Sequence, residues 1–234
     1  SVTVKKTRFK PQRAITITLF LLPAALIYIA LVILPVVQAA YFGFYKWNGL
    51  GPATNFVGID NYVRILSDEI FHGALIHNLI LIVLSLVTQL PLALACALLV
   101  GRNMRGRSGF RMIYFLPFVL SEVVTGLIWS FIYHPRAGLL NWILSIIAPN
   151  WDPPSWLGTP NYLVLGAIFV VIIWKYFGYH MILYVAGLQN IPSEIEEAAQ
   201  IDGASGWQVI RYVIIPLLGP TIRLTIYLSV LGSL

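Results

Sequence analysis

Long apolar stretches alternate with short polar ones along this chain of 234 residues. Five apolar stretches reach the roughly 20 residues that a helix needs to cross the hydrocarbon core of a bilayer. The pattern therefore predicts an all-α polytopic membrane protein with five visible spans. Prolines inside the spans are expected to kink these helices rather than break them, as at Pro23, Pro35, Pro91 and Pro117. The five stretches cover approximately residues 14–37, 74–100, 112–133, 162–188 and 213–234.

Composition agrees with a membrane protein and argues against other classes. Hydrophobic residues make up 59% of the chain and charged residues 10%, whereas a soluble domain is about one-quarter charged. The net charge of +6 comes from basic residues grouped between apolar stretches, which membrane orientation explains better than nucleic-acid binding does. The single cysteine, Cys96, lies within an apolar stretch, so a disulfide framework is excluded.

The basic residues also predict the orientation, because cytoplasmic loops are enriched in Lys and Arg. With a cytoplasmic N-terminus, only Lys46, Arg64 and Arg136 fall outside. We therefore expect a basic cytoplasmic tail at residues 1–13, followed by a multi-pass membrane domain at residues 14–234. The ten basic residues that fall inside are Lys5, Lys6, Arg8, Lys10, Arg13, Arg102, Arg105, Arg107, Arg111 and Arg211.

The last apolar stretch stops at Leu234 without a loop, a cap or a charge. Five spans would leave the C-terminus outside, and an even number of spans is commoner for this layout. We therefore expect six spans in the complete protein, and a sequence that lacks its C-terminal part.

Motifs typical of nucleotide binding, catalysis or metal binding are weak or absent in this sequence. Residues 101–108 are similar to a phosphate-binding loop, but Arg107 stands where lysine is required, and the loop joins two spans instead of a strand and a helix. No Ser-His-Asp, Cys-His or paired-carboxylate arrangement is visible. We therefore predict no enzyme, no ATPase site, no metal site and no cofactor in this chain. The four histidines lie on different segments without metal-ligand spacing, at His72, His77, His134 and His180.

Two ionisable residues stand inside predicted spans. Glu122 lies about midway along residues 112–133, and Lys175 about midway along residues 162–188. A charge at bilayer depth is costly unless it is paired or faces water, so each indicates function. Two interpretations stay open, a structural ion pair between helices and a shared polar cavity near the midplane. Residues suited to a sugar-like ligand surround them, namely Ser121, Thr125, Trp129, Trp174, Tyr176, Tyr179 and His180.

The longest polar interval in the second half of the chain covers residues 191–205 and holds four of the nine acidic residues. Ser193 is expected to cap a short helix here, with Glu196 as its capping-box partner and Gly203 as a left-handed stop. Such a short helix is not stable alone, so we expect it to pack on something else. The predicted orientation places it in the cytoplasm.

This interval and its sequel resemble a known motif. Glu197-Ala198-Ala199, then Gly203, and after nine intervening residues Val213-Ile214-Ile215-Pro216 are similar to the EAA motif of the integral-membrane subunits of bacterial ABC importers. In that motif isoleucine, any residue, leucine and proline end the pattern, so Val213 and Ile215 depart from it conservatively. Asp202-Gly203-Ala204 also matches. The wider chain resembles the carbohydrate-uptake branch, which includes the maltose, glycerol-phosphate and multiple-sugar permeases.

The resemblance implies the fold of a type I ABC importer transmembrane domain, with a cytoplasmic coupling loop at residues 189–212. It implies a second homologous permease as heterodimer partner, two ATP-binding subunits that carry ATP and Mg, and an extracytoplasmic solute-binding protein. The location would be the bacterial inner membrane, the substrate a small-molecule sugar, and nucleic acid would not be a partner. The ATPase-coupling residues would be Glu197, Ala198, Ala199, Asp202, Gly203 and Ala204.

The family's sugar contacts, aligned through the same motif, fall on or beside Lys175 and Tyr176, and on Ser229 and Ser233. Lys175 departs from the apolar residue expected there. It would suit an anionic or differently hydroxylated substrate, or only a partner for Glu122. The candidate substrate residues are therefore Glu122, Trp129, Lys175, Tyr176, Ser229 and Ser233.

Two hypotheses for function follow. The first is a permease subunit of an ATP-driven carbohydrate importer, which forms half of the translocation pathway and couples to a cytoplasmic ATPase. The alternative is a proton-coupled carrier or a membrane-embedded enzyme with Glu122 as its titrating group. Only the alternative predicts transport or turnover without an ATPase subunit. The sequence leaves the identity of the sugar open.

Overall fold

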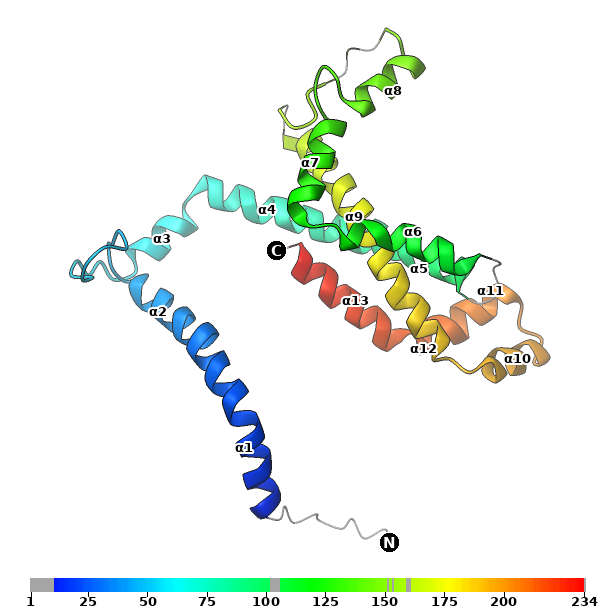
Figure 1. Cartoon of the computed structure of the whole chain (residues 1–234), viewed down its shortest axis with the longest axis horizontal. Coiled ribbons are helices and arrows are strands. Elements are labelled where there is room, and N and C mark those ends of the chain that lie inside the picture. The colour runs from blue at the N-terminus through cyan, green and yellow to red at the C-terminus, as the bar shows by residue number, and fades with distance from the viewer. Residues whose placement is uncertain (1–10, 102–105, 151, 153, 159–160, 234) are drawn as a thin grey trace. The chain divides into compact units, whose positions relative to one another are not determined.

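The computed structural model describes residues 11–101, 106–150, 152, 154–158 and 161–233 (Figure 1). Every long regular element in these residues is a helix. The α-helices are α1 (Pro11–Tyr28), α2 (Leu34–Phe42), α3 (Asp60–Leu66), α4 (Glu69–Leu84), α5 (Leu90–Val100), α6 (Arg107–Val119), α7 (Glu122–Ile132), α8 (Leu139–Ile147), α9 (Asn161–Gln189), α10 (Ser193–Ile201), α11 (Gly206–Val209), α12 (Ile215–Leu217) and α13 (Gly219–Gly232). Three π-helical turns join some of them, η1 (Ile29–Ile33), η2 (Ser85–Gln89) and η3 (Ile210–Ile214).

The five predicted spans correspond to three continuous helices and two bent pairs. The continuous ones are Ile15–Phe42, Glu69–Val100 and Tyr162–Gln189. α6 and α7 meet at a bend of 98°, and the segment from α11 to α12 meets α13 at a bend of 67°. The expectation that residues 112–133 form one helix kinked at Pro117 is therefore wrong, because that span breaks at Leu120 and Ser121.

Each π-helical turn in the described chain ends two residues before a proline, namely Pro35, Pro91 or Pro216. Proline lacks an N–H group, and its ring clashes with the carbonyl four residues earlier, which here lies within the π-helical turn. The wider turn accommodates the ring, and the first two of these helices continue past it. The prediction of uninterrupted spans at Pro35 and Pro91 is confirmed.

Contacts divide the chain into two compact units, residues 1–73 and residues 74–234. In the first unit, the connection from α2 to α3 is held by Asn61, whose side-chain amide donates to the carbonyls of Gly43 at 2.9 Å and Tyr45 at 3.0 Å. The hydroxyl of Tyr62 donates to the Ala40 carbonyl at 3.0 Å. The first residues of α3 therefore fix how the chain leaves α2.

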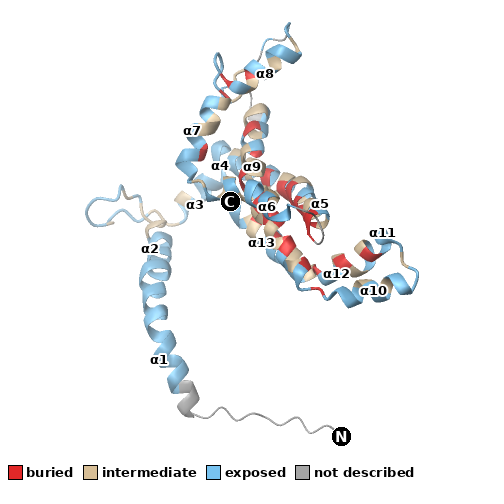
Figure 2. Ribbon diagram, turned by 45° about the vertical axis from the view of Figure 1, so that its right-hand side comes forward, coloured by how far each residue is buried: buried red, intermediate tan, exposed pale blue. Residues whose placement is uncertain are grey.

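The second unit packs around α9, where its buried residues concentrate (Figure 2). Met181 and Tyr184 of α9 belong to the same buried cluster as Ala97 of α5. α6 crosses α9 at Gly178, where an added Cβ would collide with the backbone of Tyr114. Small residues at a crossing let two helix backbones approach closely, which is how membrane helices gain packing energy.

Candidate functional site

The turn after α10 has the geometry that the sequence predicts. Gly203 has a φ of +87°, a left-handed conformation that side chains with a Cβ rarely adopt. The Ala204 amide donates to the Ala199 carbonyl at 3.0 Å, and the Gly203 amide donates to the Gln200 carbonyl at 3.0 Å. These two bonds form a Schellman motif, so the prediction that Gly203 ends this helix is confirmed.

The start of α10 differs from the prediction. Pro192 is the N-cap and Ser193 is already helical, so the proposed Ser193 and Glu196 capping box is wrong. Pro192 has a φ of −59° and a ψ of 137°, which turns the chain into the helix one residue earlier than expected. The capping box lies instead at the start of α11, where the Ser205 amide donates to Gln208 Oε1 at 2.7 Å and Ser205 Oγ accepts from the Gln208 amide.

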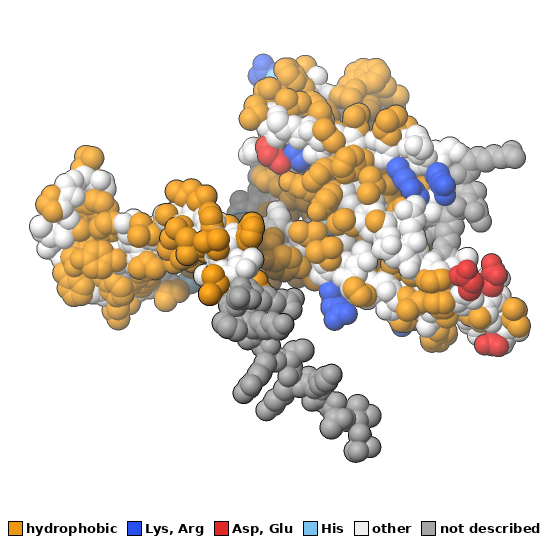
Figure 3. All heavy atoms as spheres, turned by 60° about the horizontal axis from the view of Figure 1, so that its bottom comes forward, with side chains coloured by type: hydrophobic (Ala, Val, Ile, Leu, Met, Phe, Trp, Pro, Cys, Tyr) orange, Lys and Arg blue, Asp and Glu red, His pale blue; other side chains and the backbone are white. Residues whose placement is uncertain are grey.

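The residues predicted to couple to an ATPase divide into two sets. Ala199 and Ala204 are partly buried against the core of the second unit. The apolar side chain of Ile201, in the last turn of α10, is 86% exposed. Acidic side chains gather over this segment (Figure 3), so its outer surface combines negative charge with the exposed apolar residues Ile195 and Ile201. The exposed members of the predicted set are Glu197, Ala198, Asp202 and Gly203.

The break between α6 and α7 exposes backbone groups inside an apolar span. Ser121 caps α7, its Oγ accepting from the Val124 amide at 3.3 Å. The Leu120 carbonyl accepts from the Lys175 ammonium at 2.9 Å, and Thr125 Oγ1 accepts from the same ammonium at 3.4 Å. An unsatisfied carbonyl in apolar surroundings is costly. Lys175 therefore ties α9 to the bend of the α6–α7 span.

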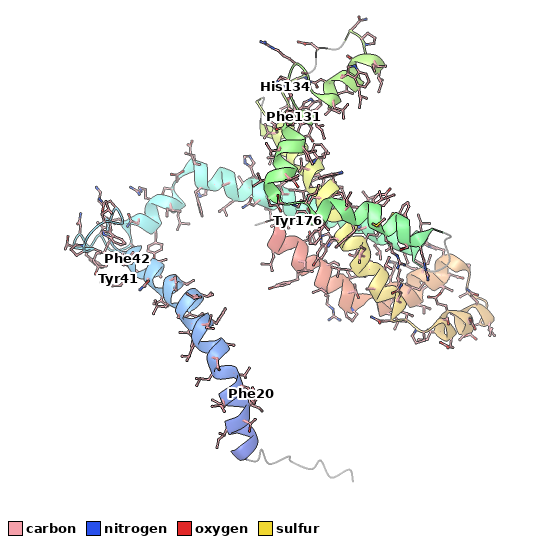
Figure 4. The ribbon with its side chains drawn as sticks, in the orientation of Figure 1. Phe20, Tyr41, Phe42, Phe131, His134 and Tyr176 are labelled. Carbon is pink, nitrogen blue, oxygen red and sulfur yellow. The ribbon has the colours of Figure 1, made fainter. Side chains whose placement is uncertain are left out.

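Glu122 balances the charge of Lys175. Its Oε1 lies 2.8 Å from Lys175 Nζ and accepts from the Tyr176 hydroxyl at 3.0 Å, where α9 passes the start of α7 (Figure 4). The Lys175 side chain is 5% exposed and that of Glu122 is 73% exposed. Of the two interpretations of these charges, the structure shows the ion pair between helices.

Tyr176 also lines a cavity of about 140 Å³ between η2, α9 and α13. Ser229 and Ser233, two further candidate substrate residues, line the same cavity, whereas Glu122 and Lys175 are not among its lining residues. Other polar lining residues are Ser85, Gln89, Tyr179 and His180. Sequence reasoning missed Ser85 and Gln89, although two polar residues four positions apart in an apolar stretch were a usable signal.

Trp129 lies away from this cavity. Its ring packs edge-to-face on Trp174 with centroids 5.7 Å apart, and its centroid is 5.0 Å from that of Tyr133. The Tyr133 hydroxyl donates to the Ala167 carbonyl at 2.9 Å. These contacts hold α7 against the N-terminal half of α9, while Trp129 Nε1 is buried without a hydrogen-bond partner among the described residues.

Comparison with protein families gives a match over more than half of the chain, which includes all of these site residues except Ser85. Residues 89–234 match the model described as binding-protein-dependent transport system inner membrane component. A probable ABC transporter permease protein of Pyrococcus horikoshii is 40% identical over 92% of this chain and 73% of its own length. The diacetylchitobiose uptake system permease protein of Streptomyces coelicolor is 34% identical over 87% of this chain and 61% of its own.

A solved structure shares the fold. It is a bacterial alginate ABC transporter in complex with an alginate pentasaccharide-bound periplasmic protein, and the matched chain has a TM-score of 0.77 at 26% identity. The match covers 93% of this chain and 72% of the other. The all-α polytopic architecture is therefore that of ABC transporter permeases.

Proposed function

The chain belongs to the family of inner membrane components of binding-protein-dependent transport systems, and we propose that it is the permease subunit of an ATP-driven carbohydrate importer. It forms half of the translocation pathway and catalyses no reaction itself. The observation that carries this proposal is the exposed α10 with its Schellman turn at Gly203, on a chain of this family. The carbohydrate named for the Streptomyces relative supports the substrate class.

The proposed assembly needs partners on both sides of the membrane. A second homologous permease completes the pathway, and an extracytoplasmic binding protein delivers the sugar. Two ATP-binding subunits, with ATP and Mg, dock in the cytoplasm on the exposed face of α10, where Glu197 and Asp202 offer charge and Ile201 offers an apolar contact. This placement requires a cytoplasmic N-terminus, which the basic residues favour.

The helices suggest how motion reaches the membrane. α10 follows α9 after a turn of three residues, and α9 runs without interruption from Gln189 back past Lys175 and Tyr176. At a rise of 1.5 Å per residue, the fourteen residues from Gln189 to Lys175 span about 21 Å. A displacement of α10 is therefore transmitted by a rigid helix to the bend of the α6–α7 span and to the cavity beside it.

The sugar binds, in this proposal, in the cavity lined by Tyr176, Ser229 and Ser233. These residues offer hydroxyl groups and an aromatic ring, the combination expected for a carbohydrate site. Glu122 and Lys175 support the site by fixing the α6–α7 bend, and Trp129 supports it by packing. The alternative carrier would need Glu122 to exchange protons, whereas its carboxylate already accepts from Lys175 and Tyr176.

The coupling assignment is tested by Gly203→Pro in the complete transporter reconstituted in proteoliposomes. Proline fixes φ near −65° and removes the amide that donates to the Gln200 carbonyl, so the Schellman turn cannot form. We expect ATP-driven sugar uptake to fall by at least about tenfold while the variant still inserts and assembles, because α10 no longer holds its docking position.

Gly206→Pro is the matched control. Gly206 is the first residue of α11, a position that tolerates proline, and Ser205 before it has the extended ψ of 159° that proline requires. This variant should transport like the wild type. Normal uptake by Gly203→Pro would refute the coupling role, and uptake without any ATP-binding subunit would favour the Glu122 carrier instead.

A further inference from the structure

The cavity beside Tyr176 contains polar atoms that the fold leaves unsatisfied. Ser85 Oγ, Gln89 Nε2 and His180 Nδ1 are buried, and none of the three has a hydrogen-bond partner within the described part of the chain. Their residues are 1%, 1% and 3% exposed, and all three line the cavity. A buried polar atom without a partner is costly, so three around one small space indicate a molecule that supplies the missing partners.

The neighbouring residue shows that this helix can satisfy its own polar side chains. Thr88, also in η2, donates its hydroxyl to the Leu84 carbonyl at 2.7 Å. Ser85 and Gln89 lie four positions apart, so both point toward α9 from the same side of the helix. The π-helical turn before Pro91 thus presents two unsatisfied side chains to the cavity, and His180 of α9 adds a third.

The absence of charged side chains from the cavity lining, among the described residues, limits which ligands can bind there. Its lining among the described residues includes no Asp, Glu, Lys or Arg. The closest cation in sequence to Tyr176 is Lys175, whose ammonium is already engaged by Glu122 and by the Leu120 carbonyl. An anion bound here would be desolvated without a counter-charge, which is strongly unfavourable.

We infer that Ser85, Gln89 and His180 form a subsite for the hydroxyl groups of an uncharged polyhydroxy solute, which presupposes the proposed transport function. A hydroxyl both donates and accepts, so it can pair with the Gln89 amide, the Ser85 hydroxyl and either tautomer of the His180 ring. The side chains of Phe118 and Tyr179, whose rings stack on each other with centroids 4.4 Å apart, also line the cavity and supply apolar surface.

Size and position agree with such a solute. The volume of about 140 Å³ equals roughly five water molecules at their share of the liquid, enough for the hydroxyl-bearing part of one sugar unit. Ser229 of α13 and Ser233, the C-cap residue of that helix, line the same space. In the subsite, hydroxyl-bearing side chains from three helical segments surround one ligand. Ser85 and Gln89 of η2 therefore contribute to the substrate specificity of the transporter.

The experiment measures ATP-driven uptake by the complete transporter in proteoliposomes. The uncharged probes are maltose, xylose and diacetylchitobiose, and the anionic probe is an alginate trisaccharide. We expect the wild type to carry an uncharged probe in preference to the anionic one. Gln89→Leu should lower uptake of that sugar about five- to tenfold, the effect of losing one hydrogen bond.

Thr88→Val is the matched control, since its hydroxyl is satisfied within the helix, and it should keep uptake within about twofold of the wild type. The decisive readout is uptake of monodeoxy derivatives of the carried sugar. For the derivative that lacks the hydroxyl bound by Gln89, wild type and Gln89→Leu should be equal, because their shared interaction is already absent.

The outcomes separate the subsite from the transport function. If Gln89→Leu lowers uptake of the sugar and of every deoxy derivative by one common factor, Gln89 is structural and the subsite is refuted. Preference for the alginate trisaccharide would refute the uncharged substrate class. A wild-type transporter that carries no probe of either class would overturn the carbohydrate function itself, and the subsite with it.

Discussion

Lys175 and His180 lie on the same helix five residues apart, and their polar atoms are in opposite situations. The Lys175 ammonium has a carboxylate, a carbonyl and a hydroxyl within 3.4 Å. Nδ1 of His180 has no partner within the described residues, and the same holds for the nearby Ser85 Oγ and Gln89 Nε2. Within this part of α9, the Lys175 ammonium therefore has hydrogen-bond partners, whereas Nδ1 of His180 has none in the described chain.

The comparison shows that charge inside a span does not by itself mark the ligand site. Burying the Lys175 ammonium costs the most free energy, and the bend of the α6–α7 span explains its presence, because the ammonium binds the free Leu120 carbonyl there. The neutral groups Ser85 Oγ, Gln89 Nε2 and His180 Nδ1 cost less to bury, and among the described residues they remain without partners beside a cavity. For this permease, the unsatisfied amide, hydroxyl and imidazole are therefore better indicators of ligand binding than the ion pair.

The largest effect is expected from Glu122→Gln. It leaves the buried Lys175 ammonium without a counter-ion, and we expect a loss of about 3 kcal/mol in the free energy of unfolding. This lies at the lower end for a broken buried pair because Glu122 itself is 73% exposed to solvent screening. Equilibrium unfolding in detergent micelles measures the change.

The double variant Glu122→Gln with Lys175→Met provides the control for that prediction. It removes the buried charge, so it should be more stable than Glu122→Gln alone, although the Leu120 carbonyl loses its donor. If Glu122→Gln were as stable as the wild type, the ion pair would have no structural role, and the contrast with the cavity would disappear.

A second, smaller effect tests whether both regions depend on the position of α9. Gly178→Ala puts a methyl group against the Tyr114 backbone of α6, and we expect it to lower the unfolding free energy by about 2 kcal/mol. Gly166→Ala on the same helix has no atom within 4 Å of the added Cβ and should not destabilise the protein. Equal stabilities of the two variants would argue against the close α6–α9 crossing.

The smallest stability change is expected from Gln89→Leu. This variant tests most directly whether the cavity groups, unlike the Lys175 ion pair, have no structural role. Replacing an unsatisfied buried amide by an apolar side chain of similar size should leave the free energy of unfolding within about 1 kcal/mol of the wild type, or raise it. Unfolding measured on the same preparation as the uptake assay gives the value. A loss of several kcal/mol would show that Gln89 has a structural partner after all.

Local pattern predicted those features that depend on a few neighbouring residues. The apolar stretches located the spans because their length and composition are set by the bilayer. Gly203 was predicted as a helix stop because only glycine takes a positive φ at low cost, and it does so here. The predicted cap at Ser193 failed because Pro192 starts the helix first, and the break after Val119 has no mark in the periodicity.

Hydropathy and motif spacing are properties of consecutive residues, so the amino-acid sequence is enough to predict a helical membrane protein with an EAA-like segment between its fourth and fifth spans. The contacts of the polar residues inside the spans depend instead on how the helices pack. Glu122 and Lys175 are 53 positions apart, and Gln89 and His180 are 91 apart. Whether such residues meet, and which atoms remain unpaired, depends on how α6 breaks and where α9 crosses it, which no local pattern encodes.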